Sequence, residues 1–341
     1  MPLLRVIRDR HANPTDRMTW AGFDVDGWTH EFCGTVPQPW ADYRQYERLE
    51  ELDGADLYDV ADLMYPWAQE AVERWPGKCV ATIWENIPFN YWSPAAARML
   101  AGVRAFIPRS QMAAECIATY GIERERIHIV PAAVDTTLFR PLAERRLSGG
   151  RRVLYVGRLT WEKGLMDLAY ACRGQEWRVA LAGDGPMREW AESVYGPARG
   201  YDGPWLEGVL GQLEHGPGLV ALMNAADIVV MPSISTPTWI EQFGVVSIEA
   251  MACGTPIVTS DSGAFREIVP TVHMSYRYDH GFVPFFPAGR WDLLRDTVNT
   301  ILGEAKLWRE CSRRCEDRAR HEFGHEAIGA RLREVYGQYV P

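Results

Sequence analysis

The sequence lacks three features: a framework of paired cysteines, a long apolar run and an excess of basic residues. Its seven cysteines are an odd number and are scattered among apolar stretches without regular spacing. Reduced thiols in a cytoplasmic protein are the simplest interpretation. Cys311 and Cys315 stand one helical turn apart, but two cysteines alone do not complete a tetrahedral site. We therefore expect neither a disulfide scaffold nor a bound metal.

No apolar segment approaches the length that crosses a bilayer, and the first residues contain too short an apolar run for a signal peptide. The formal net charge is -9, and acidic residues outnumber basic ones in both halves of the chain. Without a basic face, the chain is not expected to bind nucleic acid. A local basic patch formed on folding would still allow peripheral contact with a membrane. We expect a cytoplasmic protein without a transmembrane segment.

The common glycine-rich phosphate motifs are also missing. Gly183-Asp-Gly185 begins like a dinucleotide-binding fingerprint, but Arg188 stands where the third glycine would be. No Gly-x4-Gly-Lys-Ser/Thr loop occurs either. These absences argue against an NAD enzyme and a P-loop enzyme, and we expect no cofactor.

The composition is that of an ordinary globular protein. Hydrophobic residues make up 47% and charged residues 24% of the 341 residues, which excludes disordered and fibrous classes. A chain of this length exceeds what one hydrophobic core usually supports, so two domains are expected.

Short apolar runs separated by glycine turns and helical patterns recur at 153–156, 177–182, 228–231 and 256–259. Such runs predict a parallel sheet covered on both faces, which gathers its ligands at the carboxyl ends of its strands. The first half repeats this rhythm less clearly. There we expect strands at 56–60, 79–83, 104–107 and 127–130, and helices at 94–100 and 111–120.

The domain boundary is predicted from a polar stretch, residues 141–150, that would link two such sheets. The N-terminal domain would span 1–148 and the C-terminal domain 149–341. Apolar residues at helical spacing predict a terminal helix at about 325–338, which we expect to pack back on the N-terminal domain.

The densest motif is Glu241-Gln-Phe-Gly-Val-Val-Ser-Ile-Glu-Ala-Met-Ala-Cys-Gly-Thr-Pro256. It resembles the E-x7-E signature of the retaining glycosyltransferases of family 4. Blocks at 153–164, 181–186, 226–233 and 262–268 follow the family's order, so the resemblance covers 151–270. It implies an α/β fold of the GT-B type, with two Rossmann-like doubly wound domains facing across a cleft.

The resemblance assigns Arg158 and Lys163 to the phosphates of a nucleotide-sugar donor. Fixed positive charge there would stabilise the departing nucleoside diphosphate, in place of a divalent cation. A helix that begins near Gly244 would add unpaired N–H groups and the positive end of its dipole. The alternative is that the two residues are ordinary surface cations.

The resemblance gives Glu249 to the ribose hydroxyls and Glu241 to the transferred sugar. Neither would be a nucleophile. Both would accept hydrogen bonds from hydroxyl groups on one side of the donor, and they would not flank the bond between sugar and phosphate. Ordinary ion pairs of a solvated helix are the alternative. The other residues that the resemblance places at the donor are Gly157, Gly183, Gly185, Leu213, Gln242, Phe243, Gly244 and Val245.

The resemblance reaches back only to about Arg104, and residues 128–141 resemble the family's junction between domains. Earlier in the chain, no glycine pair stands where the family usually has a glycine-rich loop. Glu85 and Asn86 are candidates for binding acceptor hydroxyls, with capping of a turn as an equal alternative. His11 is a further acceptor candidate, although a surface histidine is the commoner role.

These observations predict a retaining, metal-independent hexosyltransferase. It would move a sugar from a nucleotide-sugar donor to a hydroxyl of a glycan, lipid-linked or small-molecule acceptor. Family analogy suggests cell-surface polysaccharide or glycoconjugate synthesis. The alternatives are a nucleotide-sugar epimerase or hydrolase on the same fold, and a non-catalytic donor-binding subunit.

Overall fold

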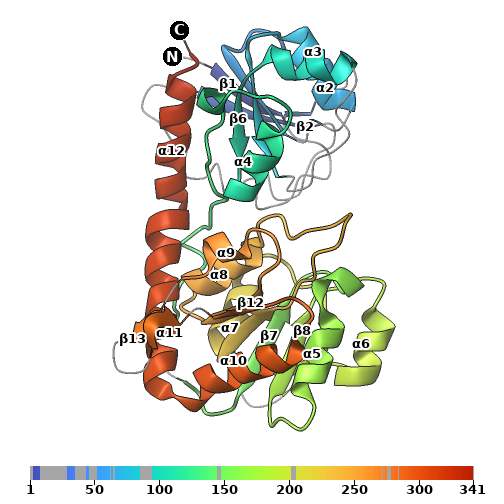
Figure 1. Ribbon diagram of the computed structural model, residues 1–341, viewed down its shortest axis with the longest axis vertical. Helices are drawn as coiled ribbons and strands as arrows, with labels where there is room; N and C mark the ends of the chain where they lie inside the picture. The colour runs from blue at the N-terminus through green and yellow to red at the C-terminus, as the bar shows by residue number, and fades with distance from the viewer. Residues whose placement is uncertain are drawn as a thin grey trace. The chain divides into compact units, whose positions relative to one another are not determined.

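The computed structural model describes residues 3–7, 29–34, 44–45, 52–61, 63, 66–84, 94–143, 147–200, 205–270, 272–274, 278–282 and 284–340. They form two compact units (Figure 1). Unit 1 comprises Met1–Ala133 and His325–Pro341, and unit 2 comprises Val134–Gly324.

Unit 1 is built on a six-stranded sheet in the order β3-β2-β1-β4-β5-β6, in which every neighbouring pair is parallel. Its strands are β1 (Leu3–Ile7), β2 (Thr29–Gly34), β3 (Arg44–Gln45), β4 (Leu57–Ala61), β5 (Cys79–Ile83) and β6 (Val103–Pro108). Its helices are α2 (Pro66–Arg74), α3 (Pro94–Gly102), α4 (Gln111–Ala118) and α12 (His325–Gly337).

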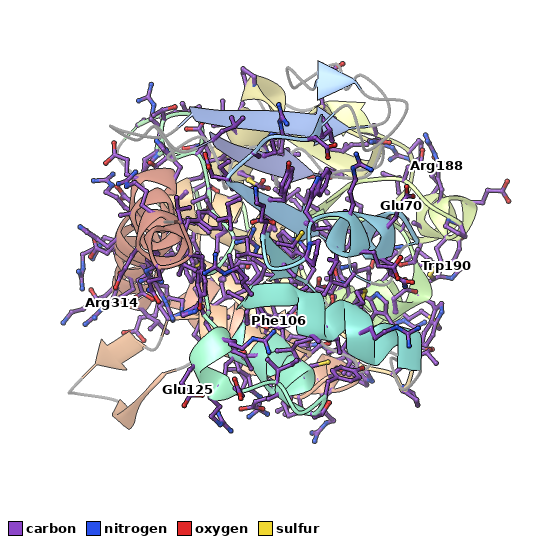
Figure 2. The ribbon with its side chains drawn as sticks, turned by 90° about the horizontal axis from the view of Figure 1, so that it is seen from above. Glu70, Phe106, Glu125, Arg188, Trp190 and Arg314 are labelled. Atoms are coloured by element: carbon purple, nitrogen blue, oxygen red, sulfur yellow. The ribbon has the colours of Figure 1, made fainter. Side chains whose placement is uncertain are left out.

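Both faces of this sheet are covered, as continuous apolar strands require. On one face, Tyr58, Val60 and Phe106 pack with residues of α2, α3 and α4. Phe106 lies inside the unit, whereas Glu125 points outward from the turn that follows α4 (Figure 2).

On the opposite face, Leu57 and Ile107 pack with Leu332 and other residues of α12. A buried polar contact accompanies this packing, because Asp59 accepts hydrogen bonds from the hydroxyls of Thr82, at 2.9 Å, and Tyr336. The chain's last helix is therefore part of the core of unit 1.

The strands predicted at 56–60, 79–83 and 104–107 are confirmed as β4, β5 and β6. The strand predicted at 127–130 is wrong. A 3-10 turn (Arg124–Arg126) leads into this segment, and its backbone donates to the carbonyls of Phe106 and Pro108 with a single bridge at Ile127. Pro108 has no N–H to donate in return, so a regular ladder cannot continue there.

Unit 2 is built on a seven-stranded sheet in the order β15-β12-β11-β7-β8-β10-β9. Among the described strand pairs of this sheet, β10 and β9 are antiparallel and the others are parallel. Its strands are β7 (Arg152–Val156), β8 (Arg178–Ala182), β9 (Arg199–Gly200), β10 (Leu206–Gly211), β11 (Ile228–Met231), β12 (Ile257–Ser260) and β15 (Phe285–Phe286), and a separate hairpin comprises β13 (Val272–Met274) and β14 (Tyr278–Phe282). Its helices are α5 (Leu165–Cys172), α6 (Arg188–Tyr195), α7 (Pro217–Ala225), α8 (Val245–Ala252), α9 (Phe265–Ile268), α10 (Trp291–Gly303) and α11 (Ala305–Arg318), followed by a π-helical segment (Ala319–Phe323).

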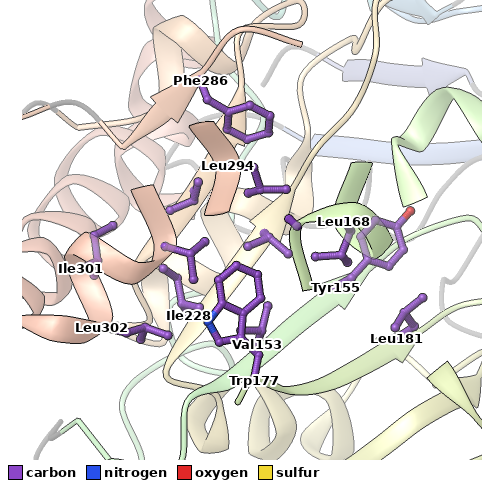
Figure 3. Close-up of a cluster of buried hydrophobic side chains, with 14 of the residues drawn as sticks. Val153, Tyr155, Leu168, Trp177, Leu181, Ile228, Phe286, Leu294, Ile301 and Leu302 are labelled. Atoms are coloured by element: carbon purple, nitrogen blue, oxygen red, sulfur yellow. The ribbon is translucent and has the colours of Figure 1, made fainter. Parts of the chain in front are cut away.

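One hydrophobic core cluster of unit 2 lies between the sheet and the helices α5 and α10 (Figure 3). Strand residues Val153, Tyr155 and Ile228 meet Leu168 of α5 and Leu294 of α10 there. The four strands predicted for this half are confirmed as β7, β8, β11 and β12. Without the antiparallel β9, the strand order within each unit is the 3-2-1-4-5-6 of a doubly wound sheet, so the α/β prediction is confirmed.

The described residues 134–143 and 147–148 belong to unit 2 by their contacts. The backbone N–H of Leu142 donates to the side chain of Asn224 at 2.9 Å, and Ser148 donates to Asp227 through both its backbone N–H and its hydroxyl. Within the polar stretch, Leu142 therefore lies against α7 and Ser148 against the start of β11.

Candidate functional site

Close-packed glycines shape the loops at the carboxyl ends of β7 and β8. Gly157, Gly183 and Gly185 have φ angles of +152°, +156° and +154°. A Cβ atom on Gly183 would lie 1.8 Å from the carbonyl oxygen of Gly157, and one on Gly185 would lie 2.6 Å from that of Leu159. Only glycine fits such an approach, so the two loops lie backbone against backbone.

Between these loops and the end of β10 lies a pocket of about 230 Å³. Its lining residues are Val156, Gly157, Arg158, Ala182, Gly183, Asp184, Gln212, Leu213 and Leu219. Its mixed apolar and polar lining at the carboxyl ends of three neighbouring strands is typical of a ligand site in this class of fold.

Lys163 is placed by the glycine that follows it. Gly164 ends the 3-10 turn Trp161–Lys163 with φ +71°, and a Cβ there would lie 1.8 Å from the carbonyl oxygen of Pro232. The turn after β7 is therefore pressed against the end of β11. β7 and β11 are the neighbouring strands at which the sheet order reverses, where doubly wound folds place their ligands.

At this point Lys163 and Glu241 form an ion pair, with 2.7 Å between Nζ and Oε2. The side chains are only 14% and 8% exposed. Ser233 donates its hydroxyl to the same carboxylate oxygen at 2.7 Å, and the Lys163 ammonium lies 4.9 Å from the ring centre of Trp239. A positive and a negative group are thus held together in a largely dry environment, where electrostatic interactions are strong.

Gly244 sets the start of α8. Its φ is +74°, and a Cβ would lie 2.2 Å from the Phe265 ring. The N–H of Ser247 donates to the carbonyl of Gly244 at 2.8 Å, whereas the earlier N–H groups of α8 have no partner within the helix, and the helix dipole makes this end positive. The end of α8 next to Glu241 can therefore receive an anion.

Glu249, one turn further along α8, pairs with a residue that sequence analysis did not single out. Nε2 of His215 lies 2.7 Å from Oε1 of Glu249, whose side chain is 4% exposed. Burial lowers the pKa of His215, but the hydrogen bond and charge of Glu249, together with the charge of Asp135, outweigh it. The pKa of His215 therefore lies above its ordinary value.

The other predicted site residues have different surroundings. Arg158 lines the pocket with its side chain 63% exposed, and it reaches Glu162 at 3.6 Å. The ring of Phe243 is buried against Phe323, with 6.0 Å between ring centroids, whereas Gln242 is exposed.

Three predicted acceptor residues, Glu85, Asn86 and His11, lie outside the described residues. Sequence analysis also missed Ser233 and Trp239. Ser233 ends the block at 226–233. Its position just after a predicted strand indicates a residue at the carboxyl end of the sheet, where ligands bind.

The described residues contain neither a candidate metal site nor a candidate membrane-spanning helix. They contain no group of three or more histidine, cysteine, aspartate or glutamate side chains that could hold a metal ion. Nor does the described part of the chain contain a helix that is long and apolar enough to cross a membrane.

The family model described as "Glycosyl transferases group 1" matches residues 143–321. The chain belongs to this family. Among curated relatives, a glycogen synthase of Mycobacterium tuberculosis is 28% identical over 228 residues, covering 65% of this chain and 51% of the relative. A D-inositol 3-phosphate glycosyltransferase of Pseudarthrobacter chlorophenolicus is 31% identical over 192 residues, covering 51% of this chain and 42% of the relative. The chain thus spans about half the length of the curated relatives that it matches.

Solved structures resemble this chain over nearly all of its length. HepE of Anabaena, solved with UDP-glucose, has a TM-score of 0.71 at 17% identity and covers 99% of this chain and 100% of its own. A glycosyltransferase of Rickettsia africae has a TM-score of 0.74 at 15% identity, covering 99% and 98%. With the two doubly wound units, these likenesses show that the fold is GT-B.

Proposed function

We propose that this group 1 family member is a retaining glycosyltransferase that uses a nucleotide-sugar donor. The observation that carries the proposal is the convergence, within unit 2, of a pocket, the start of a helix and the Lys163–Glu241 pair at the carboxyl ends of adjacent parallel strands. This arrangement offers separate places for a base, a diphosphate and a sugar.

Each part of the donor finds a matching group. The base would occupy the pocket beside Asp184 and Leu213. The ribose hydroxyls would donate to Glu249, and the diphosphate would face the start of α8 together with Arg158 and Lys163. The transferred sugar would donate its hydroxyls to Glu241.

The Lys163–Glu241 contact supports this order of groups. A cation that binds the departing phosphate must lie next to the group that binds the sugar, because the broken bond joins phosphate and sugar. Lys163 and Glu241 are in direct contact at 2.7 Å. Negative charge that develops on the leaving diphosphate would be stabilised in a site that excludes most water.

In the proposed reaction the acceptor oxygen forms a bond to C1 of the sugar as the bond from C1 to the phosphate oxygen breaks. Attack comes from the face that the phosphate leaves, so the configuration at C1 is retained. The acceptor's proton passes to the departing phosphate, and the products are a glycoside and a nucleoside diphosphate. Arg158 and Lys163 supply the positive charge, so no divalent metal is required.

The acceptor is proposed only as a class. The relatives named above are a glycogen synthase and an inositol phosphate glycosyltransferase, which share sugar transfer and differ in acceptor. We propose a glycan, lipid-linked or small-molecule hydroxyl acceptor, and a role in cell-surface polysaccharide or glycoconjugate synthesis in the cytoplasm.

The test begins with a thermal-shift screen of UDP-, ADP- and GDP-sugars on the full chain, because a ligand that binds the folded state raises apparent stability. The stabilising donor is then incubated with candidate acceptors, with and without excess chelator, and the product is examined by NMR. We expect a glycoside with the donor's anomeric configuration under both conditions. Inverted configuration, loss of activity with chelator and rescue by magnesium, or hydrolysis and epimerisation without transfer would each contradict the corresponding part of the proposal.

A further inference from the structure

His215 stands between the carboxylate of Glu249 and the segment that precedes β7. It lies in the loop after β10, and its Nε2 is 2.7 Å from Glu249 Oε1. The fully buried ring of Phe139 packs on it, with 5.0 Å between ring centroids and 54° between ring planes. Three segments distant in sequence therefore fix the imidazole in one orientation.

The Glu249 carboxylate needs this partner because the side chain is almost completely buried on α8. Removing a carboxylate from water is costly unless hydrogen bonds or opposite charge replace the water. Among the described residues, His215 is the one whose side chain donates to this carboxylate. A carboxylate can accept at about four positions on its two oxygens, so Oε2 keeps its capacity when Oε1 is occupied.

We propose that His215 is a positioning residue for nucleotide binding: its Nε2–H holds Glu249 Oε1, so that Oε2 faces the ribose hydroxyls of the donor. The inference rests on the proposed function, in which Glu249 reads the ribose. The imidazole does not touch the nucleotide in this arrangement and acts through the carboxylate.

Protonation of His215 gives this arrangement a dependence on pH. The charged groups that face the imidazole are Glu249 on α8 and Asp135 in the segment before β7, whereas Phe139 is uncharged. Glu214, the preceding residue on the same loop, is exposed. The His215 side chain is 22% exposed and can exchange its proton with solvent.

The direction of the pH dependence of nucleotide affinity follows from these charges. The imidazolium offsets two carboxylates close to an anionic ligand. Above the raised pKa of His215 the proton is lost, and the two carboxylates repel the diphosphate without a compensating positive charge. Nucleoside diphosphate binding should therefore weaken as the pH rises through that pKa.

The experiment is a cycle in which both the protein and the ligand are changed. Calorimetry compares wild type and His215→Ala with UDP and with 2′,3′-dideoxy-UDP, and ADP and GDP are tried beside UDP to find the accepted base. We expect His215→Ala to weaken binding of the intact nucleotide about tenfold, the scale of one hydrogen bond to a charged group. Measured at about pH 9, above the pKa of His215, the variant removes a hydrogen bond but no positive charge. At that pH it should change dideoxynucleotide binding less than about twofold, because Glu249 then has no ribose hydroxyls to bind.

His215→Gln is the second variant, because its amide can donate to Glu249 but carries no titratable proton. It should keep nucleotide affinity within about threefold of wild type at about pH 9 and should lose the decline in affinity between about pH 6 and pH 9. Comparing proteins with the same ligand cancels the ionisation of the diphosphate itself. His321→Ala, which changes an exposed histidine of the same unit, serves as the control and should match wild type.

Two results would overturn the role of His215 while leaving the donor site intact: an equal loss of affinity for both ligands in His215→Ala at about pH 9, or an unchanged pH dependence of nucleotide affinity in His215→Gln. Failure of the wild-type protein to bind any of the three nucleoside diphosphates is a different outcome. It would refute the proposed donor and, with it, this role for His215.

Discussion

Among the described glycines with positive φ, those whose Cβ would collide with backbone atoms lie in unit 2, whereas open turn glycines occur in both units, although the two sheets share one strand order. In unit 2, Gly164, Gly183 and Gly263 approach backbone carbonyls so closely that a Cβ would lie 1.8 Å from an oxygen. In unit 1, Gly77 and Gly121 also have positive φ angles, but a Cβ on either would meet nothing within 4 Å. The first set holds loops together at strand ends, whereas the second only turns the chain.

The buried carboxylates of the motif segment differ in their partners from other buried carboxylates, including Asp227 of unit 2, which accepts from the hydroxyl and N–H of Ser148. In unit 1, Asp59 accepts from two neutral hydroxyls, those of Thr82 and Tyr336. In unit 2, Glu241 and Glu249 lie on the motif segment and pair with a lysine and a histidine. Neutral partners suit a fixed structural contact, whereas charged and titratable partners suit a site that exchanges ligands and protons.

The largest difference in the free energy of unfolding is expected when a methyl group is added to one glycine of each unit. Gly183→Ala should lower the free energy of unfolding by more than about 3 kcal/mol, because the methyl group collides with the backbone of Gly157. Gly121→Ala should cost only about 1–2 kcal/mol, the price of a left-handed conformation in open space. Urea unfolding followed by circular dichroism measures both. Equal costs would contradict the contrast between the units.

Removing the charges of unit 2 should affect turnover more than stability. Lys163→Ala or Arg158→Ala should each lower turnover on the order of a hundredfold, because each charge acts on the leaving diphosphate. Arg290→Ala, which removes an exposed arginine paired with Asp292, is the matched control and should leave turnover and thermal stability close to the wild-type values. Turnover and thermal stability are measured side by side. Normal turnover in both Lys163→Ala and Arg158→Ala would remove the phosphate assignment.

Removing the buried hydrogen bond between Tyr336 and Asp59 in unit 1 should affect stability and not ligand binding. Tyr336→Phe removes a hydroxyl that donates to Asp59 and should lower the free energy of unfolding by about 2 kcal/mol, as expected for a hydrogen bond to a charged group. Nucleotide affinity should stay at the wild-type value. Denaturant unfolding and calorimetry give the two readings, and a loss of affinity with unchanged stability would contradict a structural role for Asp59.

Much of the fold and part of the candidate site could be predicted from the sequence. Fully buried parallel strands leave continuous apolar runs, which is why β7, β8, β11 and β12 were predicted correctly. Gly164 and Gly183 mark loops where a side chain cannot fit, so residue type and backbone geometry are coupled there.

The rest depends on contacts that no local pattern encodes. β10 was not predicted because Gly208, with φ +85°, interrupts its apolar run. His215 follows this strand, and its pairing with Glu249 arises only when the loop packs on α8. The ion pair of Lys163 with Glu241 likewise joins two motifs that are 78 residues apart.

The most direct test of the donor site compares Glu249→Gln with Glu241→Gln. Calorimetry with the accepted nucleoside diphosphate is run beside turnover with the intact donor. Glu249→Gln should weaken nucleotide binding about tenfold, because the ribose hydroxyls lose a charged acceptor. Glu241→Gln should leave nucleotide binding within about twofold of wild type and depress transfer, because its contacts belong to the sugar as the transition state forms. If both variants lost nucleotide affinity equally, or if Glu241→Gln alone lost it, the assignment of ribose and sugar to these two carboxylates would be contradicted.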